Sequence, residues 1–319
     1  MNVRVLRVAA LPVLGLAFTL AACGGQSQGT SGSDGSVSGE VVVDGSSTVQ
    51  PLTAAAGELF KEQQSGVNVS VATSGTGGGF EKFCQGQTDI SNASRPIKDE
   101  EKAICDKNKV EFSQLQIATD ALTVVVSKDN DFVDCLTTDE LKTMWAPEAE
   151  NKVKTWNQVN PDFPNEPLEL YGPGTDSGTF DYFTGEINGE EGASRSDYNA
   201  SEDDNTLVQG VEGSPNALGY FGYSYFEENV DKLKAVKIDS GDGCVAPSVE
   251  TAQDGSYTPL SRPLFIYPST KSVAEKKQVA EFVKFYGDND EDISRAAQFI
   301  PLNDEQRSTL KTEAAKLAR

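Results

Sequence analysis

The stretch Glu40-Val41-Val42-Val43-Asp44-Gly45-Ser46-Ser47-Thr48 contains, in chain order, the features that predict the local fold. Its short apolar run is typical of a buried strand, and the Gly and Ser residues that follow are typical of a turn. Behind the turn, Leu52, Ala56 and Phe60 repeat at the spacing of one helix face. The stretch therefore predicts a strand, a Gly-rich turn and a helix, which is the unit of an α/β domain.

Two later segments repeat this order of strand, turn and helix. Residues 67–72 alternate as a strand does and lead into Ser74-Gly75-Thr76-Gly77-Gly78-Gly79. Residues 168–171 lead into Gly172-Pro173-Gly174-Thr175-Asp176-Ser177-Gly178-Thr179. A Gly-rich turn lets backbone N–H groups converge, a helix N-terminus favours negative charge, and Ser and Thr hydroxyls add uncharged donors. Three such turns in one chain predict a pocket for a small oxyanion.

The length of 319 residues suits two domains of ordinary size. Residues 121–128 and 264–267 are the strongest predicted strands, and we interpret them as two strands that cross between the domains. Lobe 1 would then comprise residues 40–128 and 264–319, with a largely parallel sheet, and lobe 2 would comprise residues 129–263. Two crossings predict a hinge, with the binding site in the cleft between the lobes.

The N-terminus has the pattern of an export signal. Arg4 and Arg7 precede an apolar run over residues 8–22, which is shorter than the roughly 20 residues that a membrane-spanning helix needs. The ending Leu20-Ala21-Ala22-Cys23 resembles a bacterial lipobox, which implies a signal peptide over 1–22 and a lipid on Cys23 that inserts into the bilayer. Residues 23–39 would be a flexible tether, because they are almost all small and polar. The alternative is a plain signal peptide with an incidental cysteine.

Four further cysteines are expected to form two disulfides, because the chain is predicted to be exported. Three pairings are possible, and we favour Cys84–Cys105 and Cys135–Cys244 because each bridge then stays within one predicted lobe. A metal site is the alternative, but the chain has no Cys-x-x-Cys and no histidine. We therefore predict no metal and no cofactor.

Charge and composition exclude several classes of function. The chain has 49 acidic and 27 basic residues and a formal net charge of −22, which makes nucleic acid an improbable partner. Without histidine there is no Ser-His-Asp or Cys-His pair, and no spacing of carboxylates or lysines indicates catalysis, so we predict that the protein is not an enzyme. An approaching anion meets a repulsive field, so local donors must act at short range, since fields decay over roughly 8 Å at about 0.15 M salt.

Four segments carry a family resemblance: Gly45–Val49, Ser74–Gly78, Asn92–Ile97 and Thr175–Phe180. In this order they resemble the phosphate-specific substrate-binding proteins of ABC importers (the PstS type), over residues 40–302. The resemblance implies an α/β, two-lobed, periplasmic-binding-protein-like fold with the ligand between the lobes. It also implies a monomer, lipid-anchored on the extracytoplasmic face of the cell membrane, that captures inorganic phosphate and delivers it to an ABC permease.

The resemblance assigns phosphate-binding roles residue by residue. These positions are Ser47, Thr48, Val49, Thr76, Gly77, Ser94, Arg95, Asp176, Ser177, Gly178 and Thr179. Arg95 departs from the family, because it stands where better-known members have an acidic residue, and Pro173 lies near their arginine. Arg95 is then either a bidentate phosphate ligand or a surface ion-pair partner. Asp176 either orients Arg95, accepts the proton of HPO₄²⁻, or caps its helix.

Other functions remain open from the sequence. The same fold would suit a receptor for another oxyanion, such as sulfate, molybdate or an organic phosphate. A non-catalytic surface adhesin is a second possibility. A phosphate-ester hydrolase is disfavoured, because it would normally need metal ligands or a nucleophile with a base.

Overall fold

The computed structural model of the protein describes residues 37–175 and 177–319. The predicted signal peptide, the Cys23 anchor, most of the tether and Asp176 lie outside the described residues. The described residues belong to one compact unit. Within the described part, no helix is long and apolar enough to cross a membrane.

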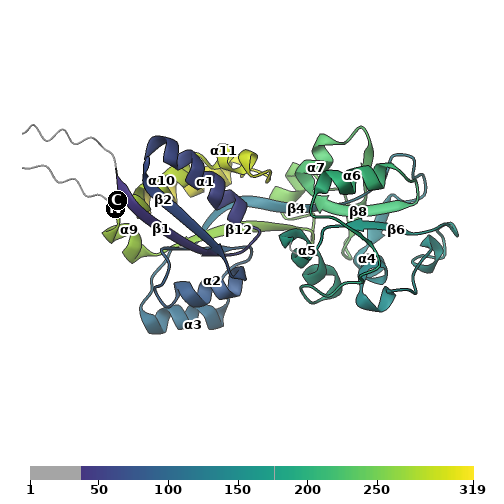
Figure 1. The fold of residues 1–319 in the computed structure, drawn as a ribbon, viewed down its shortest axis with the longest axis horizontal. Helices are drawn as coiled ribbons and strands as arrows, with labels where there is room; N and C mark the ends of the chain where they lie inside the picture. The colour runs from purple at the N-terminus through teal and green to yellow at the C-terminus, as the bar shows by residue number, and fades with distance from the viewer. Residues whose placement is uncertain (1–36, 176) are drawn as a thin grey trace, which may run out of the picture. The chain divides into compact units, whose positions relative to one another are not determined.

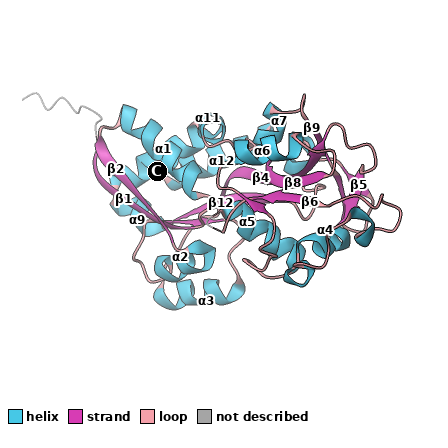
Figure 2. Ribbon diagram, turned by 45° about the vertical axis from the view of Figure 1, so that its right-hand side comes forward, coloured by secondary structure: helices cyan, strands magenta, loops and turns pink. Residues whose placement is uncertain are grey.

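The predicted strand, turn and helix are present at the start of this unit. Strand β1 (Ser38–Gly45) leads to helix α1 (Gln50–Gln63), and β2 (Gly66–Thr73) leads to α2 (Gly75–Phe83). Next come β3 (Ile90–Ala93) and α3 (Asp99–Asn108). Strand β1 begins slightly before the predicted start of folded sequence, and α2 begins within the Gly cluster rather than at Phe80. Helices α1 and α2 lie on opposite sides of the sheet (Figure 2).

Two long strands connect two hydrophobic cores. Strands β4 (Leu115–Ser127) and β12 (Ser261–Pro268) run side by side and antiparallel through the middle of the molecule (Figure 1). Ile117 and Leu264 pack in the core formed with β1, α1 and α10 (Lys277–Asp288), whereas Leu122 and Val124 pack in a second core with residues from the middle of the chain. The predicted crossing strands are therefore confirmed. The change of core lies between residues 118 and 122, because β4 contributes its second half to the second core. The division into two lobes with a boundary at residue 128 stays a prediction.

The middle of the chain builds the second core. It contains β5 (Cys135–Thr137), α4 (Thr138–Trp145), short 3₁₀ turns (Pro147–Ala149, Trp156–Gln158), β6 (Glu169–Gly172), α5 (Gly178–Phe183), a π-helical turn (Thr184–Asn188), β7 (Asn199–Ala200), α6 (Asp204–Glu212), β8 (Ala217–Gly222), α7 (Tyr223–Glu228), β9 (Leu233–Ala235), β10 (Lys237–Asp239), β11 (Cys244–Val245) and α8 (Val249–Gln253). Helix α4 is capped by Thr137, whose Oγ1 accepts a hydrogen bond from the N–H of Glu140 at 3.1 Å.

The main sheet has the strand order β2-β1-β3-β12-β4-β8-β6-β7, with β9 paired to β4. Its two ends are parallel, but β12 and β4 pair antiparallel with each other and with their neighbours β3 and β8. The expectation of a largely parallel sheet was therefore wrong. The physical reason is the crossing itself: one strand leaves the first core and the other returns to it, so neighbouring crossing strands run in opposite directions.

The C-terminal helices complete the first core. They are α9 (Thr270–Glu275), α10 (Lys277–Asp288), α11 (Asp290–Ala296) and α12 (Asp304–Leu317). Helices α9 and α10 are separated at Lys276, whose backbone is extended. Helix α10 buries Val279, Phe282 and Tyr286 on one face, as its periodicity predicts.

Both predicted disulfides are confirmed. Cys84–Cys105 joins the end of α2 to α3, and Cys135–Cys244 joins β5 to β11 in a separate three-stranded sheet of order β11-β10-β5. Cys84 and Cys105 are buried together in a small hydrophobic cluster with Phe80 and Phe83, and Cys135 and Cys244 both lie in the middle part of the chain.

The first residue of α6 gives a prediction about stability and pH. Burial, with the negative charges of Asp203 and Glu202, raises the pKa of Asp204 to about 6. The folded state then binds more protons than the unfolded state between about pH 4 and 6, so this group destabilises the fold as the pH rises through that window. We expect Asp204→Asn to stabilise the protein at pH 7 by about 1–3 kcal/mol and to change nothing at pH 3. Guanidinium unfolding of both proteins at the two pH values measures this, and an equal difference at both would contradict it.

Candidate functional site

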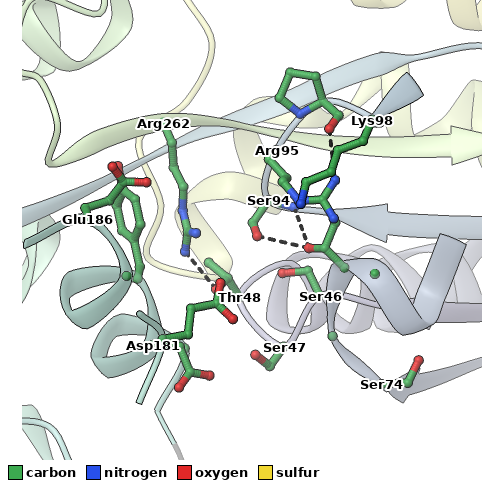
Figure 3. Close-up of a pocket in the computed structure, with 18 of the residues that line it drawn as sticks. Ser46, Ser47, Thr48, Ser74, Ser94, Arg95, Lys98, Asp181, Glu186 and Arg262 are labelled. Carbon is green, nitrogen blue, oxygen red and sulfur yellow. Dashed lines mark hydrogen bonds between the residues drawn. The ribbon is translucent and has the colours of Figure 1, made fainter. Parts of the chain in front are cut away.

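A cavity of about 720 Å³ lies where the three Gly/Ser/Thr turns meet the crossing strands (Figure 3). It is lined by Ser46, Ser47, Thr48, Ser74, Gly75, Thr76, Gly77, Ser94, Arg95, Pro96, Lys98, Gly178, Asp181, Tyr182, Gly185, Glu186, Glu190, Glu191, Arg262 and Pro263. Seven of the eleven predicted positions are among them: Ser47, Thr48, Thr76, Gly77, Ser94, Arg95 and Gly178. Val49 is fully buried behind the cavity, Ser177 and Thr179 do not line it, and Asp176 lies outside the described residues.

The first turn is held by a close backbone contact. Gly45 has φ of 143°, and a Cβ on it would lie 2.1 Å from the carbonyl oxygen of Asn92. The N–H of Ser46 donates to the same oxygen at 3.0 Å. The chain then turns into α1, where the N–H of Gln50 donates to the carbonyl of Ser46 at 3.1 Å and the next residue is a proline without an N–H. The side-chain donors that the first turn presents to the cavity are therefore the hydroxyls of Ser47 and Thr48.

A buried carboxylate orders the second turn. Asp44 is 4% exposed, and its Oδ1 accepts from the N–H and Oγ of Ser74 at 3.0 and 2.8 Å. Although burial would raise the pKa of Asp44, hydrogen bonds from Lys82 and Ser74 hold it below its ordinary value. The turn is also tied to the next segment, because the hydroxyls of Thr76 and Ser94 are 3.1 Å apart. These contacts fix the start of α2 against the cavity.

Arg95 forms a bidentate ion pair in this structure. Its two terminal nitrogens donate to Glu101 at 2.9 and 2.7 Å, and this hydrogen bonding raises the pKa of Arg95 above its ordinary value. Glu101 also accepts from the N–H of Lys98 at 2.8 Å at the start of α3. The guanidinium fork of Arg95 is thus occupied by a carboxylate, as in the ion-pair interpretation, and a role as phosphate ligand stays a prediction.

The third turn approaches the first. Ser177 caps α5 by accepting from the N–H of Thr179 at 3.2 Å. A Cβ on Gly178 would lie 2.6 Å from Oγ1 of Thr48 and 3.2 Å from its backbone nitrogen. Gly178 therefore brings the second core against the start of α1, and only a residue without a side chain fits there.

Arg262, on crossing strand β12, is a site residue that the sequence reasoning missed. It lies opposite Asp120 on β4, and its Nε donates to the Asp120 carboxylate at 3.1 Å. Its NH2 group donates to Thr48 Oγ1 at 3.0 Å, and its guanidinium carbon lies 3.6 Å from the centre of the Tyr182 ring. The only sequence signal was a charged residue beside a strongly apolar strand, which gives no indication of what lies opposite it.

The opposite wall of the cavity is acidic and was also missed. Asp181 and Glu186 lie on the Arg262 side of Thr48, and Ser94, Arg95 and Lys98 lie on the other (Figure 3). Burial raises the pKa of Asp181 and of Glu186, Glu191 adds to both effects, and the positive charge of Arg262 opposes them. Within the described ranges, no group of three or more His, Cys, Asp or Glu residues is placed to hold a metal ion.

Comparison with known proteins identifies the family. A model described as the PBP superfamily domain matches residues 30–289. A phosphate-binding protein PstS of Staphylococcus saprophyticus is 43% identical over 91% of this chain and 88% of its own length. The chain belongs to the PstS family of the PBP superfamily. Protein SphX of Synechocystis is 48% identical over 83% of this chain and 79% of that protein.

Solved structures agree with this assignment. A possible phosphate-binding protein of Planctomyces limnophilus has a TM-score of 0.84 and 45% identity, over 89% of this chain and 100% of that one. An ABC-type phosphate transport receptor of Vibrio cholerae has a TM-score of 0.65 at 19% identity, over 82% of this chain and 99% of that one, which is a likeness of fold alone. The family resemblance and the periplasmic-binding-protein-like fold expected from the sequence are both confirmed.

Proposed function

We propose that this PstS family member is an extracytoplasmic receptor that binds inorganic phosphate in the cavity and delivers it to an ABC-type permease. The observation that carries the proposal is the convergence of the three Gly/Ser/Thr turns on one cavity, in a chain whose relatives are named phosphate-binding proteins. The proposal requires no covalent step, so the protein would act as a receptor and not as an enzyme.

The proposed ligand contacts are mainly uncharged donors. Hydroxyls of Ser47, Thr48, Thr76 and Ser94 line the cavity, and backbone N–H groups of the turns that carry them would add to these donors. Hydrogen bonds to an ionised acceptor are about twice as strong as neutral ones, so several such donors together can hold a desolvated anion. Binding through both cores would favour closure of the lobes around the ion, which is how an occupied receptor would differ from an empty one.

The place of action is part of the same proposal. A chain exported by the segment 1–22 and acylated at Cys23 would remain at the outer face of the cytoplasmic membrane, next to its permease. We propose that it acts there as a monomer. Metabolic labelling with a fatty acid, compared between the wild-type chain and Cys23→Ala, tests the anchor.

Thermal unfolding of the protein freed of ligand tests the function. Binding to the folded state alone adds RT ln(1 + [L]/Kd), so about 1,000-fold excess of phosphate over Kd is expected to stabilise by about 4 kcal/mol. Sulfate at equal ionic strength is expected to produce no comparable rise in Tm. Equal rises would instead support a general oxyanion receptor, and no rise with either anion would overturn the proposal.

The acidic wall leads to a prediction about association rate. Glu191 is exposed at the cavity and interacts electrostatically with Asp181, Glu186 and Arg95. Removing its charge by Glu191→Gln is expected to speed phosphate association by about 2–5-fold at low salt, and by less at high salt. Stopped-flow measurements check this, with Glu313→Gln on α12 as a control for the same loss of charge away from the cavity. Equal rates for the two variants would contradict the prediction.

A further inference from the structure

The cavity contains cationic side chains with very different surroundings. Among the described residues that line it, these are Arg95, Lys98 and Arg262. Arg95 is held by both oxygens of Glu101, and Lys98 is exposed. Arg262 has a side chain that is only 15% exposed and lies beside the hydroxyl at the start of α1. It is therefore the best-placed of these charges to meet an anion that is held by the turns.

Arg262 retains unused donors. A guanidinium has five N–H donors in a fixed fork. In the described part of the chain, its hydrogen bonds are one from Nε to Asp120 and one from NH2 to Thr48. The remaining N–H groups lie on a partly buried side chain at the cavity, where donors usually have acceptors. An oxyanion bound beside Thr48 would supply those acceptors.

The position of Arg262 is fixed by one group from the adjacent crossing strand and one from the second core. Asp120 holds Nε from the adjacent strand, and its side chain is only 8% exposed. Tyr182, from α5, places its ring against the guanidinium and anchors its own hydroxyl by donating to the carbonyl of Pro259 at 2.6 Å. Burial raises the pKa of Asp120, and the positive charge of Arg262 opposes that rise. The ion pair of Asp120 and Arg262 therefore holds one cation on the crossing strands, between the first and the second core.

We propose that Arg262 supplies the positive charge that binds the oxyanion, and that Asp120 and Tyr182 are positioning residues for its guanidinium. The inference rests on the proposed function and adds a charged ligand that comes from the hinge strand rather than from either lobe's Gly-rich turn. Because Arg262 also contacts Thr48 and Tyr182, the anion would be anchored between the start of α1 and α5.

Three variants test the charge. Arg262→Lys keeps a cation but loses the fork, and Arg262→Gln removes the cation. The double variant Arg262→Gln/Asp120→Asn also removes the buried carboxylate that the single change would leave unpaired. We expect phosphate Kd, measured by calorimetry on the intact protein, to rise about 10-fold for Arg262→Lys and at least 100-fold for the other two. The dependence of Kd on salt is expected to flatten with the lost charge.

The controls separate failure of this inference from failure of the proposed function. Arg295→Gln removes an exposed arginine of α11 and is expected to leave Kd unchanged. If the wild-type protein binds no phosphate, the proposed function is wrong, and the inference about Arg262, which rests on it, is wrong as well. If the wild type binds and the double variant, with an unliganded Tm close to that of the wild type, binds equally well, the inference alone is overturned.

The positioning role of Tyr182 needs its own measurement. We expect Tyr182→Leu to raise Kd about 10-fold by removing the ring from the guanidinium, and Tyr182→Phe to recover most of that loss. If Tyr182 only stabilised the fold, both variants would have a lower unliganded Tm, and their Kd values for phosphate would not differ from each other. Equal Kd values for the Leu and Phe variants would show that the ring does not position Arg262.

Discussion

Gly178→Ala is expected to weaken phosphate binding at least about 100-fold while leaving the unliganded protein folded. The added Cβ would lie 2.6 Å from Thr48 Oγ1 and 3.3 Å from Ser47 Oγ, inside the proposed set of ligand donors. The clash lies between α5 and the start of α1, and we expect these two elements to move slightly apart in the unliganded variant, so that the cost of the clash appears when the ligand draws them together. Calorimetry gives the Kd for phosphate and so tests the loss of binding. The Tm of the same preparation without ligand tests whether the variant is still folded.

Gly222→Ala is the matched control for that substitution. A Cβ on Gly222 would meet only Tyr225, at 3.9 Å, and its φ of −59° suits any residue. We expect this variant to bind phosphate as the wild type does. An unchanged Kd for Gly178→Ala would show that the third turn does not approach the ligand and would remove it from the site.

The turns were predictable because their signals are local. An apolar run, a Gly-rich turn and a helix-spaced stretch are each contained within about ten residues, and Gly45 must occupy a conformation that favours glycine. The order of the turns and the family resemblance then brought Thr48, Thr76 and Gly178 to one cavity, where the structure places all three. The favoured disulfides followed from the same division of the chain into two cores.

The charged part of the site was not predictable, because it depends on contacts between distant segments. Arg262 meets Asp120 through the register of two strands, which a sequence does not specify. Arg95 was given two alternative roles, as a phosphate ligand or as an ion-pair partner, and only the structure shows that its partner is Glu101 at the start of the next helix. The sheet was expected to be largely parallel, because the strand–helix repeat at each end was visible and the pairing of the crossing strands was not.

The second large effect is expected from removing the Cys135–Cys244 bridge. It closes a loop with a sequence separation of 109, against 21 for Cys84–Cys105. In the chain-entropy model, the longer loop corresponds to about 5 kcal/mol of stability and the shorter one to about 3 kcal/mol. We therefore expect Cys135→Ala/Cys244→Ala to lower the free energy of unfolding by more than Cys84→Ala/Cys105→Ala does.

The two disulfides differ in burial as well as in loop length, and burial affects the free energy of unfolding in the opposite direction. Cys84 and Cys105 are fully buried, so their replacement also removes packing in the folded state, whereas Cys244 is exposed and its loss acts mainly through the unfolded chain. Guanidinium unfolding of the two double variants, under conditions where each keeps its other bridge, gives both free energies. If the shorter loop proves the more costly, packing around Cys84 and Cys105 outweighs loop entropy. Since both bridges lie away from the cavity, either variant that remains folded should bind phosphate with the wild-type Kd.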